Sequence, residues 1–478
     1  MNSAQRKLST EELVEALEEA RARTLKLIAD LNDEQLMGPR LQIVNPLRWE
    51  VGHVAWFQEF WVLRHLGGQP PILQHGDELY DSARVAHGTR WDLPLLTMDE
   101  TLAYMRQTLE RILEQTSRDG MFLKDVEGYD EDYFLNLVLL HEQMHDEAIT
   151  YSRQTLSYSP PGISVAVVQD DHDAVFEKGR LAEQSAALTQ AESLNYATGD
   201  AQIPGGRFIL GSGPDEGFVF DNEQWAHEVE IAPFAISKTA QTNGEFKHFV
   251  EDAGYRRSEL WTPEGWQWRA SVGAEHPVYW RCEGHGRWLR RNFDSWVPLA
   301  ERLPVIHVNW YEADAYCRWA RRRLPMEAEW ELAASGEPTA EGRGLAASKR
   351  AFPWGDDPPT RERANLDWGA MGCIKVDALP AGDSAFGCRQ MIGNVWEWTA
   401  TTFGPYPGFA PGPYKEYSQP WFGDHKVLRG GCWVTRSQLI RNAYRNFYTP
   451  DRRDVWAGFR TCALQVEQAP ATRTLEPI

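Results

Sequence analysis

The stretch LVLLHEQMHDEAITY, residues 137–151, decides the N-terminal part of the fold. His141 and His145 stand four positions apart, so in a helix both project from one face, which Leu137 and Val138 mark as the inward face. An unpartnered polar group in a core costs about 1–3 kcal/mol, and a shared metal ion satisfies both imidazoles. The pattern therefore predicts a buried helix that offers two metal ligands.

Apolar residues at helical spacing predict further helices on the N-terminal side of this stretch. Ser9 is a start signal for the first helix, Pro46 opens the second, and Pro160 follows the last. A longer crossover loop joins the second helix to the third, so residues 1–160 are expected to form a four-helix bundle. The predicted helices cover residues 9–31, 47–66, 98–117 and 130–158.

His53 is the candidate for a third ligand, because it lies in the second predicted helix on an apolar face with Trp49, Trp56 and Phe57. A lone core histidine more often bonds a backbone carbonyl, whereas a third histidine beside the pair favours a metal site. Three neutral imidazoles suit Zn, Fe(II) or Cu(II) and leave coordination positions open for catalysis. A metal-free bundle that serves as a binding module stays an alternative.

The same residues match the H-E-x-x-H pattern of zinc hydrolases, in which the glutamate, here Glu142, is the general base. One extended form of that pattern continues with Gly and then His, and Ala148 and Tyr151 stand at those positions. Because the core pattern has only three fixed letters, a zinc hydrolase is kept as the weaker alternative.

The chain changes character after the bundle. Residues 161–200 form a connector with a short β-like run at 163–168 and a polar stretch behind it. Strand-like runs, single glycines and short helices then alternate over residues 201–465, and residues 466–478 form a tail. The expected fold is an α+β multidomain protein, with a helical bundle followed by an irregular α+β domain.

Composition excludes several partners. The 478 residues contain 49 Lys and Arg against 69 Asp and Glu, a net charge of −20, so phosphate backbones and anionic lipids are not expected to bind. No apolar run is long enough to span a membrane, and the N-terminus has no apolar leader, so the cytoplasm is the expected location. Most of the six cysteines are expected to be buried thiols, and the oligomeric state is not fixed.

Motifs from Ile203 to Cys462 resemble, in their order, the formylglycine-generating-enzyme (sulfatase-modifying factor) domain. Oxidase members of that family hold copper with two cysteines shortly after Arg-Gly-Gly, but here no cysteine lies between Cys432 and Cys462, so formylglycine generation is not expected. The motifs are IPGGRFILGS (203–212), HEV (227–229), TNGEF (242–246), RLPMEAEWE (323–331), FPWG (352–355), GNVWEWT (393–399), LRGG (428–431) and AGFR (457–460).

A DinB-like bundle with three histidines followed by this domain resembles the ergothioneine-type sulfoxide synthases. The resemblance implies an oxidoreductase with a non-haem Fe(II) ion held by His53, His141 and His145, with O2 as co-substrate. Such an enzyme joins sulfur to C2 of the imidazole of hercynine (N-trimethylhistidine), in a site between the two domains.

Several positions depart from the sulfur-using members. Met144 replaces a glutamine, and Arg445-Asn446-Phe447-Tyr448 replaces Arg-Asn-Trp-Asp, so the carboxylate partner of an ammonium group is missing. The chain is most similar to the selenoneine synthases, which implies a C–Se bond between hercynine and a selenosugar. Cysteine or γ-glutamylcysteine as the donor is the alternative. The segments that suggest the selenium-using relatives are 37–40, 79–82, 90–94 and 153–156.

The resemblance also implies roles for individual side chains. A loop tyrosine is the expected proton donor, and the candidates are Tyr406, Tyr414, Tyr417 and Tyr448. The candidate substrate-binding residues are Asn446, Phe447, Met144, Arg84, Arg90, Trp421 and Trp433. Asn394 and Glu397 lie in a motif that helps bind structural calcium in some relatives, and structural anchoring of the loop is the alternative.

Overall fold

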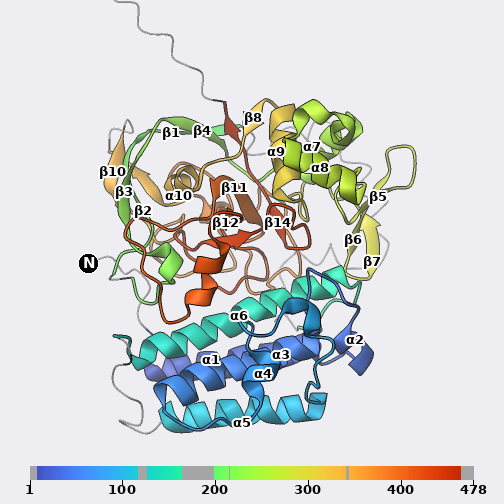
Figure 1. Cartoon of the computed structure of the whole chain (residues 1–478). Coiled ribbons are helices and arrows are strands. Elements are labelled where there is room, and N and C mark those ends of the chain that lie inside the picture. The colour runs from blue at the N-terminus through green and yellow to red at the C-terminus, as the bar shows by residue number, and fades with distance from the viewer. Residues whose placement is uncertain are drawn as a thin grey trace, which may run out of the picture.

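The N-terminal part of the chain folds into a bundle of long helices (Figure 1). The computed structural model describes residues 8–116, 126, 128–163, 199–214, 216–340 and 344–464. The long helices are α1 (Thr10–Ile28), α3 (Leu47–Gln58) with its π-helical continuation η1 (Glu59–Leu66), α5 (Met98–Thr116) and α6 (Glu131–Thr155). This confirms the expected bundle. Three pieces of one turn or so were not predicted, α2 (Asp33–Met37), α4 (Gly76–Tyr80) and η2 (His87–Thr89).

Local signals start the helices as the sequence indicates. The Ser9 hydroxyl accepts a bond from the Glu12 backbone N–H at 3.3 Å, and the Glu12 carboxylate accepts one from the Ser9 N–H at 2.8 Å. Asp130 caps α6 by accepting from the Tyr133 N–H at 3.0 Å. These bonds satisfy amides that have no partner within the helix.

A buried ion pair fixes α6 inside the bundle. Arg21 of α1 donates from Nε to Glu142 Oε1 at 2.9 Å, and both residues are at most 4% exposed. Thr24 and Gln58 donate to the same carboxylate at 2.7 Å each. Because every oxygen of Glu142 is engaged, the charge is compensated in the core.

The second domain is built from small sheets and short helices, as expected for an irregular α+β domain. One sheet has the order β1 (Asp200–Ile203), β4 (Phe234–Ser237), β15 (Cys462–Ala463), β8 (Arg322–Arg323), and another has the order β13 (Asn446–Tyr448), β12 (Lys426–Arg429), β11 (Trp396–Thr402), β14 (Ala457–Gly458). The smaller sheets pair β2 (Gly206–Leu210) with β3 (His227–Ile231), β9 (Gly336–Pro338) with β10 (Leu345–Lys349), and β5 (Trp280–Cys282), β6 (Trp288–Asn292) and β7 (Ser295–Pro298). The helices are α7 (Asn243–Glu251), α8 (Pro263–Val272), α9 (Trp310–Trp319) and α10 (Glu327–Ser335).

Pairing with β12 fixes the position of the edge strand β13. β12 pairs antiparallel with β11 through Arg429 opposite Glu397, and with β13 through Leu428 opposite Asn446. The buried guanidinium of Arg429 binds Glu327 at 2.9 Å and also binds Glu331. Such pairs hold a loop-rich domain in one arrangement, so the residues of β13 have defined positions.

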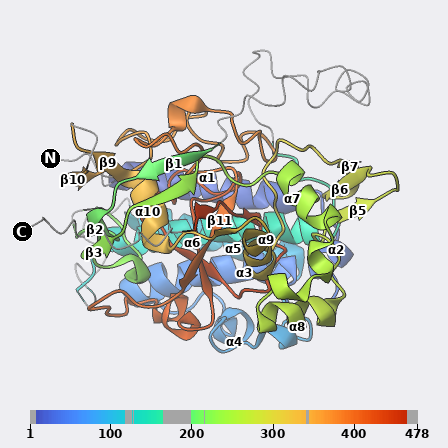
Figure 2. The same ribbon diagram turned by 90° about the horizontal axis from the view of Figure 1, so that it is seen from above.

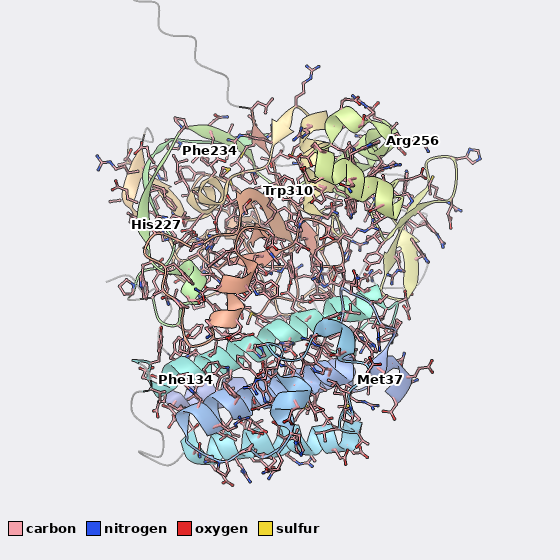
Figure 3. All side chains as sticks on the ribbon, in the orientation of Figure 1. Met37, Phe134, His227, Phe234, Arg256 and Trp310 are labelled. Carbon is pink, nitrogen blue, oxygen red and sulfur yellow. The ribbon has the colours of Figure 1, made fainter. Side chains whose placement is uncertain are left out.

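The second domain lies directly on α6. Figure 2 shows β11 above α6, and side chains fill the space between the two parts in Figure 3. Trp368 Nε1 donates to Thr150 Oγ1 at 3.2 Å, and Gln143 Nε2 donates to Gln438 Oε1 at 2.6 Å. The two parts therefore form a continuous interface along this helix.

Two of the expected segments lie mostly or wholly outside the described residues. The connector, with its β-like run 163–168, lies almost wholly outside the described residues, and the tail 466–478 lies wholly outside them. Four of the six cysteines are buried, Cys373 is half-buried and Cys282 is exposed, as expected for mostly buried thiols. None of the described helices combines the length and the apolar character that crossing a bilayer requires.

Arg21→Met tests the buried ion pair. Removing the cation leaves Glu142 buried without a counter-charge, and the expected loss of unfolding free energy is about 3–5 kcal/mol. Urea titration followed by circular dichroism measures it. The double variant Arg21→Met, Glu142→Gln should regain part of the loss, and an equal loss in both variants would contradict this account.

Candidate metal centre and cavity

Three histidines from two helices bring their ring nitrogens together. His53 of α3 and His141 and His145 of α6 each offer one nitrogen, and these atoms lie within 4.8 Å of one another. His141 Nε2 is 3.2 Å from His145 Nε2, and His53 and His141 are 2% and 3% exposed. Within the described ranges this is the only cluster of its kind.

Outer partners fix the tautomers of two of the rings. His53 Nδ1 donates to the Tyr80 carbonyl at 2.7 Å, and His145 Nδ1 donates to Glu50 Oε2 at 2.5 Å. His53 and His145 therefore keep bare lone pairs on Nε2, the arrangement that metal-bound histidines use. His141 Nε2 lies 3.2 Å from His145 Nε2, so it either donates a proton to that lone pair or, when it is itself unprotonated, can share a cation with it.

Aromatic packing holds the rings and keeps them neutral. The His53 ring lies between Trp49, at 4.8 Å and 8°, and Trp56, at 5.8 Å and 23°. Phe57 stacks on His141 at 3.5 Å. Burial lowers the pKa of His53 to about 3 and the pKa of His141 well below its ordinary value. Both rings are therefore unprotonated near neutral pH.

Glu50 and Tyr80 hold two of the histidines and were not among the predicted site residues. Glu50 lies three residues before His53 on the inward face, and a carboxylate among apolar residues is the signal that points to it. Burial acts to raise its pKa, but the His145 charge and hydrogen bond hold the pKa of Glu50 at about 2. Gly52 lets Tyr80 approach, because a Cβ there would lie 2.3 Å from the Tyr80 ring.

A cavity of about 690 Å³ lies between α6 and the second domain, and His141 and His145 line it. It is large enough for two small substrates. Of the predicted site residues it brings together Tyr414, Tyr417, Tyr448, Asn446, Phe447, Met144, Arg90 and Trp421. Sequence reasoning missed Tyr151, Glu147, Trp396, Glu416 and Tyr444, which line it as well.

Tyrosine hydroxyls cover one wall of this cavity. The hydroxyls of Tyr417 and Tyr444 are 3.2 Å apart, and they lie 3.6 and 3.4 Å from the Met144 sulfur. The Tyr414 ring meets His141 edge-on with ring centres 6.1 Å apart. Burial raises the pKa of Tyr414, Tyr417 and Tyr444, so each keeps its proton at neutral pH.

Three candidate residues do not line the cavity. The Tyr406 hydroxyl donates to Glu327 at 3.3 Å, and the Arg445 guanidinium covers its ring at 4.1 Å. Trp433 is fully buried, 5.0 Å from Trp456. Arg84 is exposed and pairs with Asp81 at 3.0 Å. The structure therefore places these three side chains outside the cavity lining, because sequence proximity to a site does not fix the direction of a side chain.

The expected calcium ligands are occupied by protein groups. Arg460 donates to both oxygens of Glu397, at 2.6 and 2.7 Å, and Trp330 also donates to it. Asn394 Oδ1 accepts from the Ile374 N–H at 2.8 Å and from Asn365 at 3.1 Å. Neither side chain has an oxygen free for a cation, so structural anchoring accounts for this motif.

Glu142 is not available as a general base. It follows His141 by one residue and therefore turns away from the cavity, into the Arg21 network of the bundle core. It is fully buried there. The zinc hydrolase alternative needs this carboxylate beside the metal, and the geometry does not support it.

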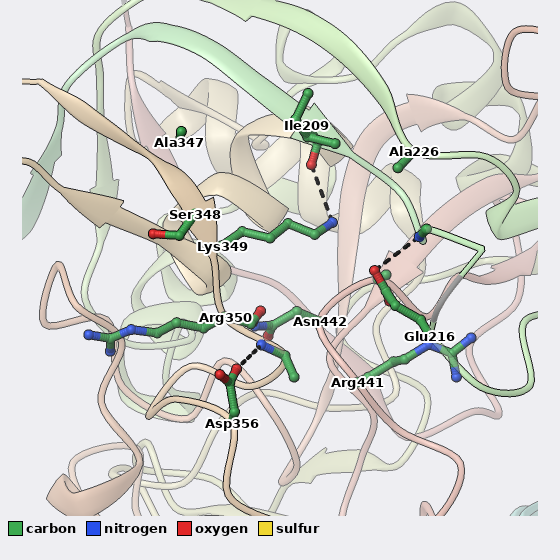
Figure 4. A pocket seen from close by; sticks show the side chains of 13 residues that line it. Ile209, Glu216, Ala226, Ala347, Ser348, Lys349, Arg350, Asp356, Arg441 and Asn442 are labelled. Carbon is green, nitrogen blue, oxygen red and sulfur yellow. Dashed lines mark hydrogen bonds between the residues drawn. The ribbon is translucent and has the colours of Figure 1, made fainter. Parts of the chain in front are cut away.

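A second cavity of about 310 Å³ lies beside β2 and β10 (Figure 4). Its charged groups are engaged by the protein. Lys349 Nζ binds Glu331 at 2.8 Å and the Ile209 carbonyl at 3.2 Å, and Glu216 accepts from the Gly213 N–H at 2.9 Å. The cavity between the domains is therefore the candidate active site.

Comparison with known proteins agrees with this two-part architecture. Residues 185–464 match the family described as sulfatase-modifying factor enzyme 1-like domain, and residues 16–149 match the DinB superfamily. Hercynine oxygenase of Mycobacterium tuberculosis is 35% identical over 95% of this chain and 98% of its own. Hercynine oxygenase of Mycolicibacterium smegmatis is 33% identical over 95% and 99%. The solved structure of PvdO from Pseudomonas aeruginosa is 25% identical, covers 55% of this chain and 92% of its own, and has a TM-score of 0.36.

Glu50→Gln tests the outer partner of His145. His145 and Asn45 donate to different oxygens of Glu50, and glutamine has only one, so one of the two donors would face an NH2 group and the expected loss of metal affinity is about 10–100-fold. Anaerobic competition with a chromophoric chelator measures it. Glu59→Gln is the matched control, because Glu59 is equally buried on the same helical stretch but accepts from Tyr104 at 2.6 Å. Equal affinities in both variants and the wild type would contradict the assignment.

Proposed function

This chain belongs to the family that contains the hercynine oxygenases, and we propose that it is an Fe(II)- and O2-dependent synthase that joins selenium to the hercynine imidazole. It is an oxidoreductase by the same kinship. The observation that carries the proposal is the convergence of three imidazoles, two of which line a cavity between the domains. Three nitrogen ligands with no carboxylate among them suit a metal with open positions.

His53, His141 and His145 hold the iron in this proposal. Bound iron supplies the activation of O2 that oxidises the chalcogen donor and the imidazole. The C2–H and Se–H bonds break and the C–Se bond forms, a two-electron oxidation in which O2 takes up the two electrons and two protons as H2O2. The aromatic wall around the rings, from Trp49 and Phe57, keeps bulk water from this reaction.

The tyrosines of the cavity wall supply protons. Tyr414 is the proposed donor, because its ring lies nearest to His141 and its raised pKa keeps the hydroxyl protonated. The trimethylammonium group of hercynine needs aromatic faces rather than hydrogen bonds, and Phe447 and Trp421 offer such faces in the same cavity. Asn446 and Met144 complete the proposed hercynine pocket.

A selenosugar is the proposed chalcogen donor. A sugar carries hydroxyls and no ammonium, which suits a wall of Tyr417, Tyr444 and Tyr448. Glu147 lines the cavity, but its oxygens accept from Trp396 at 2.6 Å and Thr435 at 2.7 Å, so it is not free to pair with an ammonium. Glu416 is the observation that favours the alternative, because this carboxylate lines the cavity and could pair with the amine of cysteine or γ-glutamylcysteine.

Reconstitution of the metal-free protein tests both proposals. Anaerobic Fe(II) followed by O2, hercynine and selenoglucose should give a C–Se product by mass spectrometry. His141→Ala should give none, because it removes a ligand. The same reaction is run with γ-glutamylcysteine and with cysteine. Equal or faster turnover with either thiol would overturn the selenium assignment and leave the iron assignment standing.

Tyr414→Phe tests the proton donor. Loss of a general acid typically costs about 10²–10⁴-fold in rate, so kcat should fall in that range with iron affinity unchanged. Tyr406→Phe is the matched control, because Tyr406 comes from the same loop but contacts Glu327 outside the cavity. A Tyr414→Phe enzyme with wild-type kcat would exclude this role.

A further inference from the structure

Arg90 is a buried cation that makes no ion pair with any described residue. It comes from the crossover loop, is only 8% exposed and lines the cavity between the domains. Its Nη2 donates to the Val85 carbonyl at 3.3 Å, whereas its Nε has no partner. A buried guanidinium with a bare N–H is ready to engage a polar or anionic group that enters the cavity.

An unbroken chain of hydrogen bonds joins Arg90 to the candidate metal centre. Arg90 Nη1 donates to Asn45 Oδ1 at 2.6 Å, and Asn45 Nδ2 donates to Glu50 Oε1 at 2.5 Å. The other oxygen of Glu50 accepts from His145 Nδ1 at 2.5 Å. Asn45 uses both ends of one amide, so it links the cavity wall to the ring that faces the other histidines.

Stacked rings provide a second connection. The Arg90 guanidinium lies 3.6 Å from the centre of the Trp49 ring, and Trp49 stacks on His53 at 4.8 Å. Arg90 is therefore connected to His53 through Trp49, and to His145 through Asn45 and Glu50. A shift of Arg90 cannot leave the surroundings of these rings unchanged.

We propose that Arg90, Asn45 and Glu50 form a relay through which the occupant of the cavity sets the donor strength of His145. The relay rests on the proposed metal function and deepens it. Asn45 and His145 compete for the charge of one carboxylate. When a ligand draws the Arg90 guanidinium away from Asn45, the amide is less polarised, and Glu50 accepts more strongly from His145. His145 then becomes the stronger metal ligand.

Reciprocity makes the proposal measurable. If a ligand at Arg90 strengthens metal binding, the metal strengthens binding of that ligand by the same factor. The ligand and the metal ion then each favour binding of the other, whichever of them binds first. A centre that binds metal most tightly only when the cavity is filled would be protected from reaction with O2 in the absence of substrate.

Cobalt and sulfate are suitable probes for the test. Co(II) reports on the histidine site through its visible absorption, and sulfate stands for an anionic group at Arg90. Co(II) affinity is measured with and without sulfate at constant ionic strength. Sulfate should raise the affinity of the wild type by about fivefold or more, the lower end of typical coupling. In Asn45→Ala the effect should vanish.

Further variants separate the possible causes. Arg90→Met breaks the chain at its other end and should lose the sulfate effect as Asn45→Ala does, so either variant tests the relay if the other folds poorly. Arg40→Met is the matched control, because Arg40 pairs with Asp92 of the same loop at the surface and should keep the sulfate effect. A sulfate effect that persists in Asn45→Ala reflects direct coordination and overturns the relay, as does a wild type without any effect.

Failure of the relay and failure of the metal centre give different results. Co(II) that binds the wild type and not His141→Ala, with no sulfate coupling, overturns the relay alone. Co(II) that binds the wild type and His141→Ala equally overturns the proposed metal centre.

Discussion

Two imidazole nitrogens that face each other 3.2 Å apart, on His141 and His145, are the constraint on which the rest of the structure depends. His145 Nδ1 donates to Glu50, so the lone pair on His145 Nε2 is left to accept a proton from His141 Nε2 or to bind a cation. Glu50 and Tyr80 fix the ring orientations of His145 and His53 by hydrogen bonds, and Phe57 and Trp49 stack on His141 and His53. These contacts come from α3 and α4, so the packing of both helices near α6 sets the positions of the three rings.

Helix α6 carries three unrelated tasks on three faces. His141 and His145 face the cavity, Glu142 faces Arg21 in the bundle core, and Glu147 reaches Trp396 and Thr435 of the second domain. Successive residues of a helix are turned by about 100°, so neighbours in sequence serve different partners. The H-E-x-x-H pattern therefore does not indicate a zinc hydrolase here, because Glu142 lies on a different face of α6 from His141 and His145.

The sequence predicted the parts that depend on local pattern. Helix bounds within a few residues, the shared face of His141 and His145, and the strand-rich second domain all follow from periodicity and from short motifs. Asn45, Glu50 and Tyr80 were missed, because their roles arise from contacts with Arg90, His145 and His53, which lie 27 to 95 positions away in the chain. Tyr406 and Tyr414 lie in one loop and looked equivalent, yet Arg445 covers the first and the cavity receives the second. Only packing distinguishes them.

The cavity is a composite whose floor and roof belong to separate folding units. In the proposed function, the histidines of the bundle hold the ion, and Tyr417, Tyr444 and Phe447 of the second domain contact the substrate. Chemistry and recognition can therefore drift independently. Under the proposed function, substitutions among these second-domain residues would change which substrate is accepted and leave the histidine ligands intact, which makes the cavity a starting point for engineering substrate specificity.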